Sequence, residues 1–170
     1  MLFQKPRLVI AALRGGSGKT LVSLGLAAAW RLHHGRRVIP FKKGPDYIDA
    51  GWLGLAAQHP CYNLDPFLME PDDMLGSFVR HSQAGDGSLV EGNRGLYDGV
   101  DARGSYSTAE VAKLLRAPVV LVLDDLHVIE ADAPFGALAY LMDHLPPRLN
   151  LVLAGRVNPG RGSTASAVRR

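Results

Sequence analysis

The chain has 170 residues, of which 47% are hydrophobic, and a formal net charge of +3, as expected for one soluble globular domain. Residues 155–170 hold four arginines and no acid, so residues 1–154 carry a net charge of −1 and no nucleic-acid surface is indicated. No apolar run approaches the roughly 20 residues of a membrane span. The single cysteine excludes an internal disulfide and favours a cytoplasmic location.

The first elements are a strand, a glycine loop and a helix. The apolar run Leu8 to Leu13 predicts a buried strand, and Lys19 to His34 predicts a helix that ends at Gly35. This order is typical of a P-loop, in which backbone N–H groups and a helix N-terminus bind phosphate. We expect the phosphates to be bound by Arg14, Gly15, Gly16, Ser17, Gly18, Lys19 and Thr20.

Two positions of this loop depart from the usual pattern. Leu13 stands where a first glycine is common, and Arg14 stands where one NTPase subgroup has a signature lysine. The alternative interpretation is a glycine-rich turn with a surface lysine. The surrounding strand and helix favour a nucleotide site, in which Lys19 reaches the outer phosphates and Thr20 ligates Mg²⁺.

Strands and helices then alternate along the chain. We predict strands at 37–41, 88–91, 117–123 and 149–154, helices at 50–58, from 71, from 107 and at 132–144, and a loop over residues 60–66. The run at 117–123 has the continuous apolar character of a central parallel strand. The fold class is therefore α/β, a P-loop NTPase-like, doubly wound and mostly parallel sheet flanked by helices. Residues 1–154 form the domain, and 155–170 a basic loop or frayed tail.

Acidic residues follow two of these strands. Asp46 and Asp49 come after the second strand, and Glu91 and Asp98 after the third. Because the carboxyl ends of parallel strands share one edge with the P-loop, these acids can meet a triphosphate there. The alternative is that the aspartates only shape turns. We predict a Mg²⁺ site from Thr20, Asp46 and Glu91, with Lys42 or Lys43 either adding positive charge or lying solvated at the surface.

Several motifs carry a family resemblance. They are Phe41-Lys-Lys-Gly-Pro-Asp-Tyr-Ile-Asp49, Asn63-Leu-Asp-Pro66, Val90-Glu-Gly-Asn-Arg-Gly-Leu-Tyr-Asp-Gly99, Ser107-Thr-Ala-Glu-Val-Ala-Lys-Leu-Leu115 and Pro118-Val-Val-Leu-Val-Leu-Asp124. Together they resemble the N-terminal synthetase domain of the cobyrinate a,c-diamide synthase family, within the wider dethiobiotin synthetase-like superfamily.

The resemblance implies an enzyme, a carbon–nitrogen ligase that uses ATP and Mg²⁺ in cobalamin biosynthesis. It would phosphorylate acetate carboxylates of a corrin, and ammonia from a glutaminase domain or from solution would then displace the phosphate. The matching positions imply catalytic roles for Lys19, Asp46, Tyr47, Asp49, Glu91 and Asp98.

Some features leave alternatives open. The family carries a C-terminal glutaminase domain with a cysteine nucleophile, whereas Cys61 lies in the synthetase half and is interpreted as structural. We therefore expect the chain to be a fragment or a natural truncation of the family protein. Whether it forms a homodimer is left open. The alternatives are a sirohydrochlorin- or siroheme-type substrate, a partitioning-type switch ATPase, and an inactive remnant. Trp30 and Trp52 are expected in the core.

Overall fold

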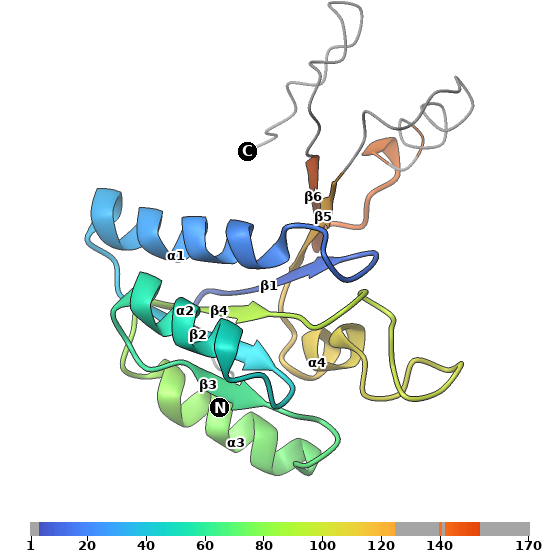
Figure 1. Ribbon diagram of the computed structural model, residues 1–170, viewed down its shortest axis with the longest axis horizontal. Coiled ribbons are helices and arrows are strands. Elements are labelled where there is room, and N and C mark those ends of the chain that lie inside the picture. Colours follow the sequence, from blue (N-terminus) through green and yellow to red (C-terminus); the bar gives the residue numbers. More distant parts are fainter. Residues whose placement is uncertain (1–3, 125–139, 141, 154–170) are drawn as a thin grey trace, which may run out of the picture.

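The sheet has six parallel strands in the order β3-β2-β4-β1-β5-β6 (Figure 1). The computed structural model describes residues 4–124, 140 and 142–153. Because helices on both faces join the first five strands in succession, the predicted doubly wound α/β fold is confirmed. The strands are β1 (Arg7–Ala12), β2 (Val38–Lys43), β3 (Tyr62–Leu64), β4 (Gly87–Glu91), β5 (Val119–Leu123) and β6 (Leu149–Leu153).

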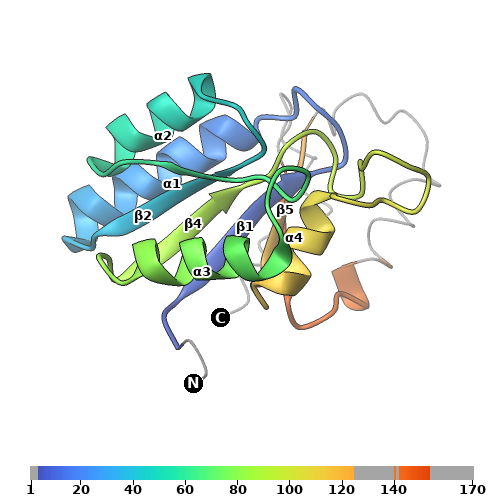
Figure 2. The ribbon, with the colours of Figure 1, turned by 90° about the horizontal axis from the view of Figure 1, so that it is seen from below.

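The helices form a layer on each face of the sheet (Figure 2). Helices α1 (Lys19–His34) and α2 (Ile48–Ala57) cover one face, and α3 (Pro71–Ser82) and α4 (Thr108–Leu114) cover the other. Among the described residues, no helix has both the length and the apolar character that crossing a bilayer requires.

Side chains of successive strand residues point alternately toward these two helix layers. This alternation determines which strand side chains reach the candidate site. In β1, Val9 belongs to the apolar cluster under α3 and α4, whereas Ile10 belongs to the cluster under α1 and α2. In the same way Phe41 of β2 faces α3 and Leu89 of β4 faces α1. Both faces are apolar because both are covered, as expected for a parallel sheet.

The helix bounds follow local signals in the sequence. Helix α1 ends as predicted at Gly35, which adopts a left-handed conformation with φ 59° and donates its N–H to Trp30 O. Helix α3 begins with Pro71 at its first turn. The predicted cap of α4 is confirmed, because the Ser107 side chain accepts a hydrogen bond from Glu110 N.

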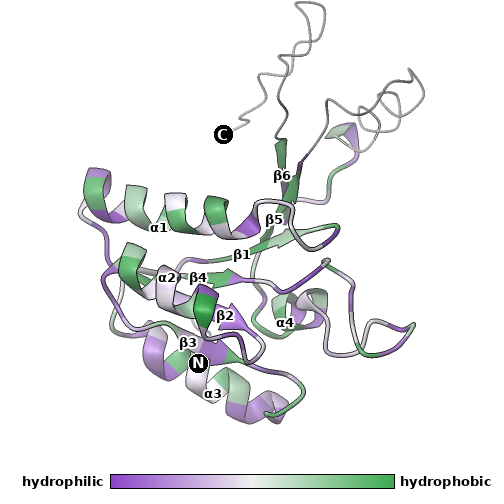
Figure 3. Cartoon of the chain, viewed as in Figure 1, coloured by the Kyte–Doolittle hydropathy of each residue, from purple (hydrophilic) through white to green (hydrophobic). Residues whose placement is uncertain are grey.

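Two predictions of local structure need correction, and two fall largely or wholly outside the described residues. The segment interpreted as a loop contains β3, a short strand that pairs with the end of β2. Trp52 is 56% exposed and not in the core, because α2 is apolar around most of its circumference (Figure 3). The helix predicted at 132–144 lies largely outside the described residues, as does the tail at 155–170.

Candidate functional site

The candidate site lies where β1, β2 and β4 end, at the carboxyl edge of the sheet. The P-loop joins β1 to α1, and its Gly16 and Gly18 have φ values of 72° and 73°. Residues other than glycine rarely adopt this backbone conformation, and so these two positions favour glycine. The Arg14 carbonyl accepts hydrogen bonds from Ser17 Oγ at 3.2 Å and from Lys19 Nζ at 3.1 Å. The loop is thus closed on itself, with the Lys19 ammonium held over it.

A buried ion pair lies beside this loop. Lys42 and Glu91 are direct neighbours in the pairing of β2 with β4. Both side chains point to the α1 and α2 face, because Lys42 lies four residues after Val38 and Glu91 lies two residues after Leu89, and both of these apolar residues are on that face. Lys42 Nζ donates to Glu91 Oε1 at 2.8 Å, and the two residues are 2% and 0% exposed. A pair buried this deeply is held by the register of the sheet rather than by flexible loops.

Two helix starts complete the cluster. Thr20, in the first turn of α1, donates its hydroxyl to Glu91 Oε1 at 2.7 Å. Asp49, in the first turn of α2, accepts from Lys42 Nζ at 2.8 Å, and its Oδ2 lies 3.5 Å from Thr20 Oγ1. One glutamate oxygen therefore receives a hydroxyl and an ammonium group, while the ammonium also bridges to a second carboxylate.

Asp46 has a different position from the other acids. Its Oδ1 accepts the backbone N–H groups of Ile48 and Asp49 at 3.0 and 3.1 Å, which secures the start of α2. Its Oδ2 lies 3.7 Å from Lys42 Nζ. Asp49 is thus the aspartate that the structure brings next to Thr20, and Asp46 orients the helix that carries it.

The electrostatics of the cluster follow from burial and pairing. Burial by itself lowers the pKa of Lys42, but its hydrogen bonds to Asp49 and Glu91 outweigh this and leave the pKa raised. Burial likewise opposes ionisation of Asp49, whereas Lys42 lowers the pKa of that carboxyl overall. Burial lowers the pKa of Lys19, and the attraction of Glu91 only partly offsets it. The charge of Lys42 is therefore balanced by two carboxylates, while among the described residues the Lys19 ammonium has no carboxylate at hydrogen-bond distance.

The cluster has donors that suit Mg²⁺. Glu91 Oε2 is buried and has no hydrogen-bond partner in the structure, a costly state for a carboxylate oxygen unless a cation or water binds it. It lies on the same carboxylate as the oxygen that Thr20 contacts. In the described residues no group of three His, Cys, Asp or Glu side chains could hold a metal by itself. Glu91 Oε2 and the Thr20 hydroxyl are oxygen donors of the kind that Mg²⁺ binds, since this ion takes one or two carboxylates and completes its shell with water and phosphate oxygens.

The remaining predicted residues lie around this cluster without joining it. Tyr47 is 81% exposed just before α2. Asp98 is exposed and accepts the N–H of Gly95 at 2.8 Å, which folds the loop after β4. Burial raises the pKa of the Cys61 thiol to about 12. A thiol that stays protonated is a poor nucleophile, which agrees with its structural interpretation.

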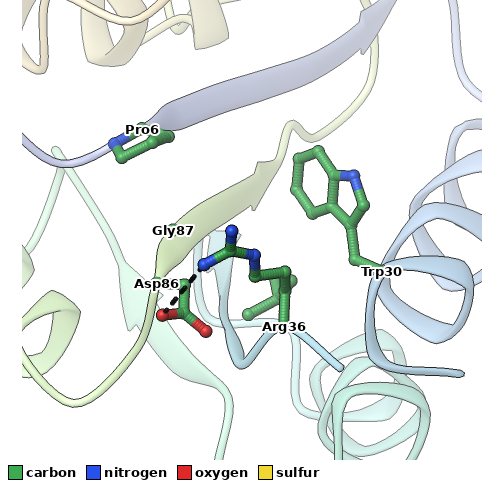
Figure 4. Close-up of a pocket in the computed structure, with 6 residues that line it drawn as sticks. Pro6, Trp30, Arg36, Asp86 and Gly87 are labelled. Carbon is green, nitrogen blue, oxygen red and sulfur yellow. Dashed lines mark ion pairs between the residues drawn. The ribbon is translucent and has the colours of Figure 1, made fainter. Parts of the chain in front are cut away.

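One hollow beside the sheet lies away from this chemistry, at the opposite edge of the strands. It has a volume of about 340 Å³ and contains an exposed ion pair, Arg36 to Asp86 at 3.9 Å (Figure 4). An exposed pair contributes little binding energy, and so this hollow is not the candidate site. Its lining residues are Pro6, Trp30, Arg36, Val38, Asp86 and Gly87.

The strand order, the glycine loop and the Lys19-Thr20 helix start define a domain of the P-loop NTPase type. Two solved structures share the fold. Chloroplast FtsY from Physcomitrella patens has a TM-score of 0.53 and 20% identity, covering 90% of this chain and 50% of that one. The hydrogenase maturation factor HypB from Archaeoglobus fulgidus has a TM-score of 0.51 and 14% identity, covering 88% of this chain and 80% of that one.

The chain belongs to the CobQ/CobB/MinD/ParA nucleotide binding domain family, whose model matches residues 8–133. A cobyrinate a,c-diamide synthase from Magnetococcus marinus is 51% identical over 134 residues, 79% of this chain and 28% of that protein. A hydrogenobyrinate a,c-diamide synthase from Streptomyces coelicolor is 53% identical over 121 residues, 70% of this chain and 24% of that protein.

These relatives confirm the resemblance found in the motifs. A further cobyrinate a,c-diamide synthase, from Archaeoglobus fulgidus, is 43% identical over 168 residues, 97% of this chain and 36% of that protein. The chain thus spans between 24% and 36% of the length of these three curated relatives.

Proposed function

We propose that the chain performs the ATP-dependent activation step in the amidation of acetate carboxylates on a corrin such as cobyrinate. The observation that carries the proposal is the buried Lys42–Glu91 pair, with a free Glu91 oxygen next to Thr20 at the P-loop. The names of the curated relatives supply the substrate class.

The proposed chemistry has two steps. An oxygen of the acetate carboxylate attacks the γ-phosphorus of ATP, the bond from that phosphorus to the β–γ bridging oxygen breaks, and ADP leaves. The product is an acyl phosphate. Ammonia then attacks the acyl carbon, the carbon–oxygen bond to phosphate breaks, and loss of a proton leaves a carboxamide and inorganic phosphate.

The first step brings two anions together, so the site must concentrate positive charge. Lys19 lies over the P-loop at the start of α1, where unpaired backbone N–H groups also face an anion. Lys42 supplies a second, fixed cation beneath this edge. When nucleotide binds, Lys19 can exchange its bond to the Arg14 carbonyl for a phosphate oxygen, because its desolvated ammonium gains more from an anion than from a carbonyl.

Mg²⁺ would supply charge neutralisation at the phosphates, held by Thr20 and Glu91 together with Asp49 or Asp46. The free oxygen of Glu91 is the donor available for it. Asp46 orients α2 and hence Asp49. We propose that the exposed Tyr47 and the loop that Asp98 folds lie toward the macrocycle carboxylate.

The test is an amidation assay with ATP, Mg²⁺, ammonium chloride and cobyrinate, in which ADP and the amides are followed by mass spectrometry. The proposal predicts ADP and amide in equal amounts, both dependent on the macrocycle. Replacing cobyrinate by sirohydrochlorin decides between the two macrocycles. ATP hydrolysis without the macrocycle and without amide would contradict the proposal and favour a switch ATPase.

The source of ammonia is a separate question. We propose that ammonia reaches the acyl phosphate either from solution or from a glutaminase domain. Comparing amide formation with ammonium and with glutamine as the nitrogen source distinguishes the two routes.

A further inference from the structure

Two exposed aromatic rings meet beside the candidate site. Phe67 lies in the turn between β3 and α3, and Tyr106 lies in the loop between β4 and α4. Their ring centroids are 5.7 Å apart and the ring planes are perpendicular. Phe67 is 68% exposed and Tyr106 is 39% exposed, and the neighbouring Leu68 is 71% exposed. Together, Phe67, Leu68 and Tyr106 form a small apolar surface, here named the shelf.

The backbone holds the shelf residues in place. Asp65 accepts the Phe67 N–H on its side chain at 2.9 Å and the Leu68 and Met69 N–H groups on its carbonyl. This tight turn directs Phe67 and Leu68 outward, while Leu64 before it is buried. Hence the turn is ordered although its two largest apolar side chains contact solvent.

Tyr106 has an unfavourable backbone conformation. Its φ is 62°, a left-handed conformation that is unfavourable for a bulky side chain. Its N–H donates to the Glu110 carboxylate, which keeps the residue at the start of α4. Strain of this kind often marks a functional position.

Charged residues interact next to the turn that carries Phe67 and Leu68. Asp65, which forms the turn, interacts electrostatically with Lys43, the residue after Lys42, and Lys43 in turn interacts with Arg94 and Asp98. Lys43 is half-buried and Arg94 is exposed. Figure 2 shows that the turn before α3 and the loop before α4 lie at the same end of the sheet. Two cations, Lys43 and Arg94, thus belong to a charged group with Asp65 and Asp98 next to the turn that carries Phe67.

We propose that the shelf binds the flat ring of a carboxylated macrocycle, and that Lys43 and Arg94 pair with its peripheral carboxylates. This inference rests on the proposed function and adds to it where the ring is bound. A macrocycle fits these residues because it combines a broad apolar face with anionic side chains at its rim. Exposed aromatic rings offer such a face large contact area with little loss of side-chain freedom. One acetate would then face the P-loop edge, where the proposed phosphoryl transfer takes place.

The test measures macrocycle binding separately from nucleotide binding. Isothermal titration calorimetry with cobyrinate and with ATP is run on the wild-type chain and on the double variant Phe67→Ala/Tyr106→Ala. The matched control is Leu32→Ala, because Leu32 is 65% exposed in the last turn of α1, about 20 Å from the P-loop. The variant Phe67→Leu keeps an apolar side chain without the ring.

The double variant should weaken cobyrinate binding about tenfold or more and leave ATP binding within about twofold. The cobyrinate affinity of Phe67→Leu should lie between those of the double variant and the wild type. The affinity of Leu32→Ala should match the wild type. If the double variant binds cobyrinate as the wild type does, and the wild type catalyses amidation, the shelf proposal is refuted and the proposed function stands. Equal loss of ATP and cobyrinate binding would also overturn it, because the pair would then be structural. A wild-type chain that binds ATP and no cobyrinate would refute the proposed function and the shelf together.

Discussion

Replacing Lys42 by methionine tests the electrostatic design of the site. Methionine keeps most of the apolar stem and removes the charge. The Lys42 ammonium lies 2.8 Å from Glu91 Oε1 and 2.8 Å from Asp49 Oδ2. At an effective dielectric constant of about 20, each contact corresponds to about 6 kcal/mol of attraction before the cost of desolvation. Removing one partner of a buried pair typically costs about 3–5 kcal/mol, because the other charge is left uncompensated. Most of this cost comes from Glu91, since Asp49 is partly exposed.

Urea denaturation followed by circular dichroism measures this cost. Lys42→Met should lower the free energy of unfolding by about 3–5 kcal/mol, whereas Lys43→Met, on the opposite face, should lower it by less than about 1 kcal/mol. The double variant Lys42→Met/Glu91→Gln should be more stable than Lys42→Met by about 1–3 kcal/mol, because it removes the unpaired charge. A loss below about 1 kcal/mol for Lys42→Met, or no recovery in the double variant, would refute the reasoning.

The remaining predictions concern the other charged residues. Lys19→Ala should weaken ATP binding by about 100-fold without loss of stability, since burial already lowers the pKa of that lysine; tight ATP binding by the variant in calorimetry would contradict the P-loop assignment. Glu91→Gln should lower amidation turnover by at least about 100-fold while destabilising less than Lys42→Met, and near-normal turnover would exclude Glu91 from the site. Asp49, whose pKa is lowered from 3.8, contributes stability that is present above that pH and lost as the pH falls through the lowered value. The stability difference between wild type and Asp49→Asn should thus be constant from about pH 5 to 9 and shrink below about pH 4; a difference that changed near neutral pH would argue against the pairing.

The P-loop and α1 could be predicted because their signals are local. A run of apolar residues, glycines at Gly16 and Gly18 and a C-terminal Gly35 lie close together in the sequence and each has one structural consequence. The order of strands and helices followed from the same kind of pattern. Strand β3 was missed because a three-residue strand has no periodicity to detect.

The partners inside the site could not be predicted, because they depend on the register of the sheet. Lys42 and Lys43 are adjacent in the sequence, and both could have been solvated. Only the pairing of Lys42 with Glu91 places the first of them, and not the second, on the face under α1 and α2. A shift by one residue would exchange their roles. The contact between Phe67 and Tyr106 is likewise non-local, since it joins two loops that lack a shared motif.

Isotope transfer tests the central claim most directly. Cobyrinate whose acetate carboxylates carry ¹⁸O is incubated with the chain, ATP, Mg²⁺ and ammonium, and the inorganic phosphate is analysed by mass spectrometry. An acyl phosphate formed at the Lys42–Glu91 edge requires that one ¹⁸O atom passes from the carboxylate to phosphate for each amide made. Phosphate that contains only oxygen from ATP and water, in amounts equal to the amide, would contradict activation of the carboxylate by phosphorylation.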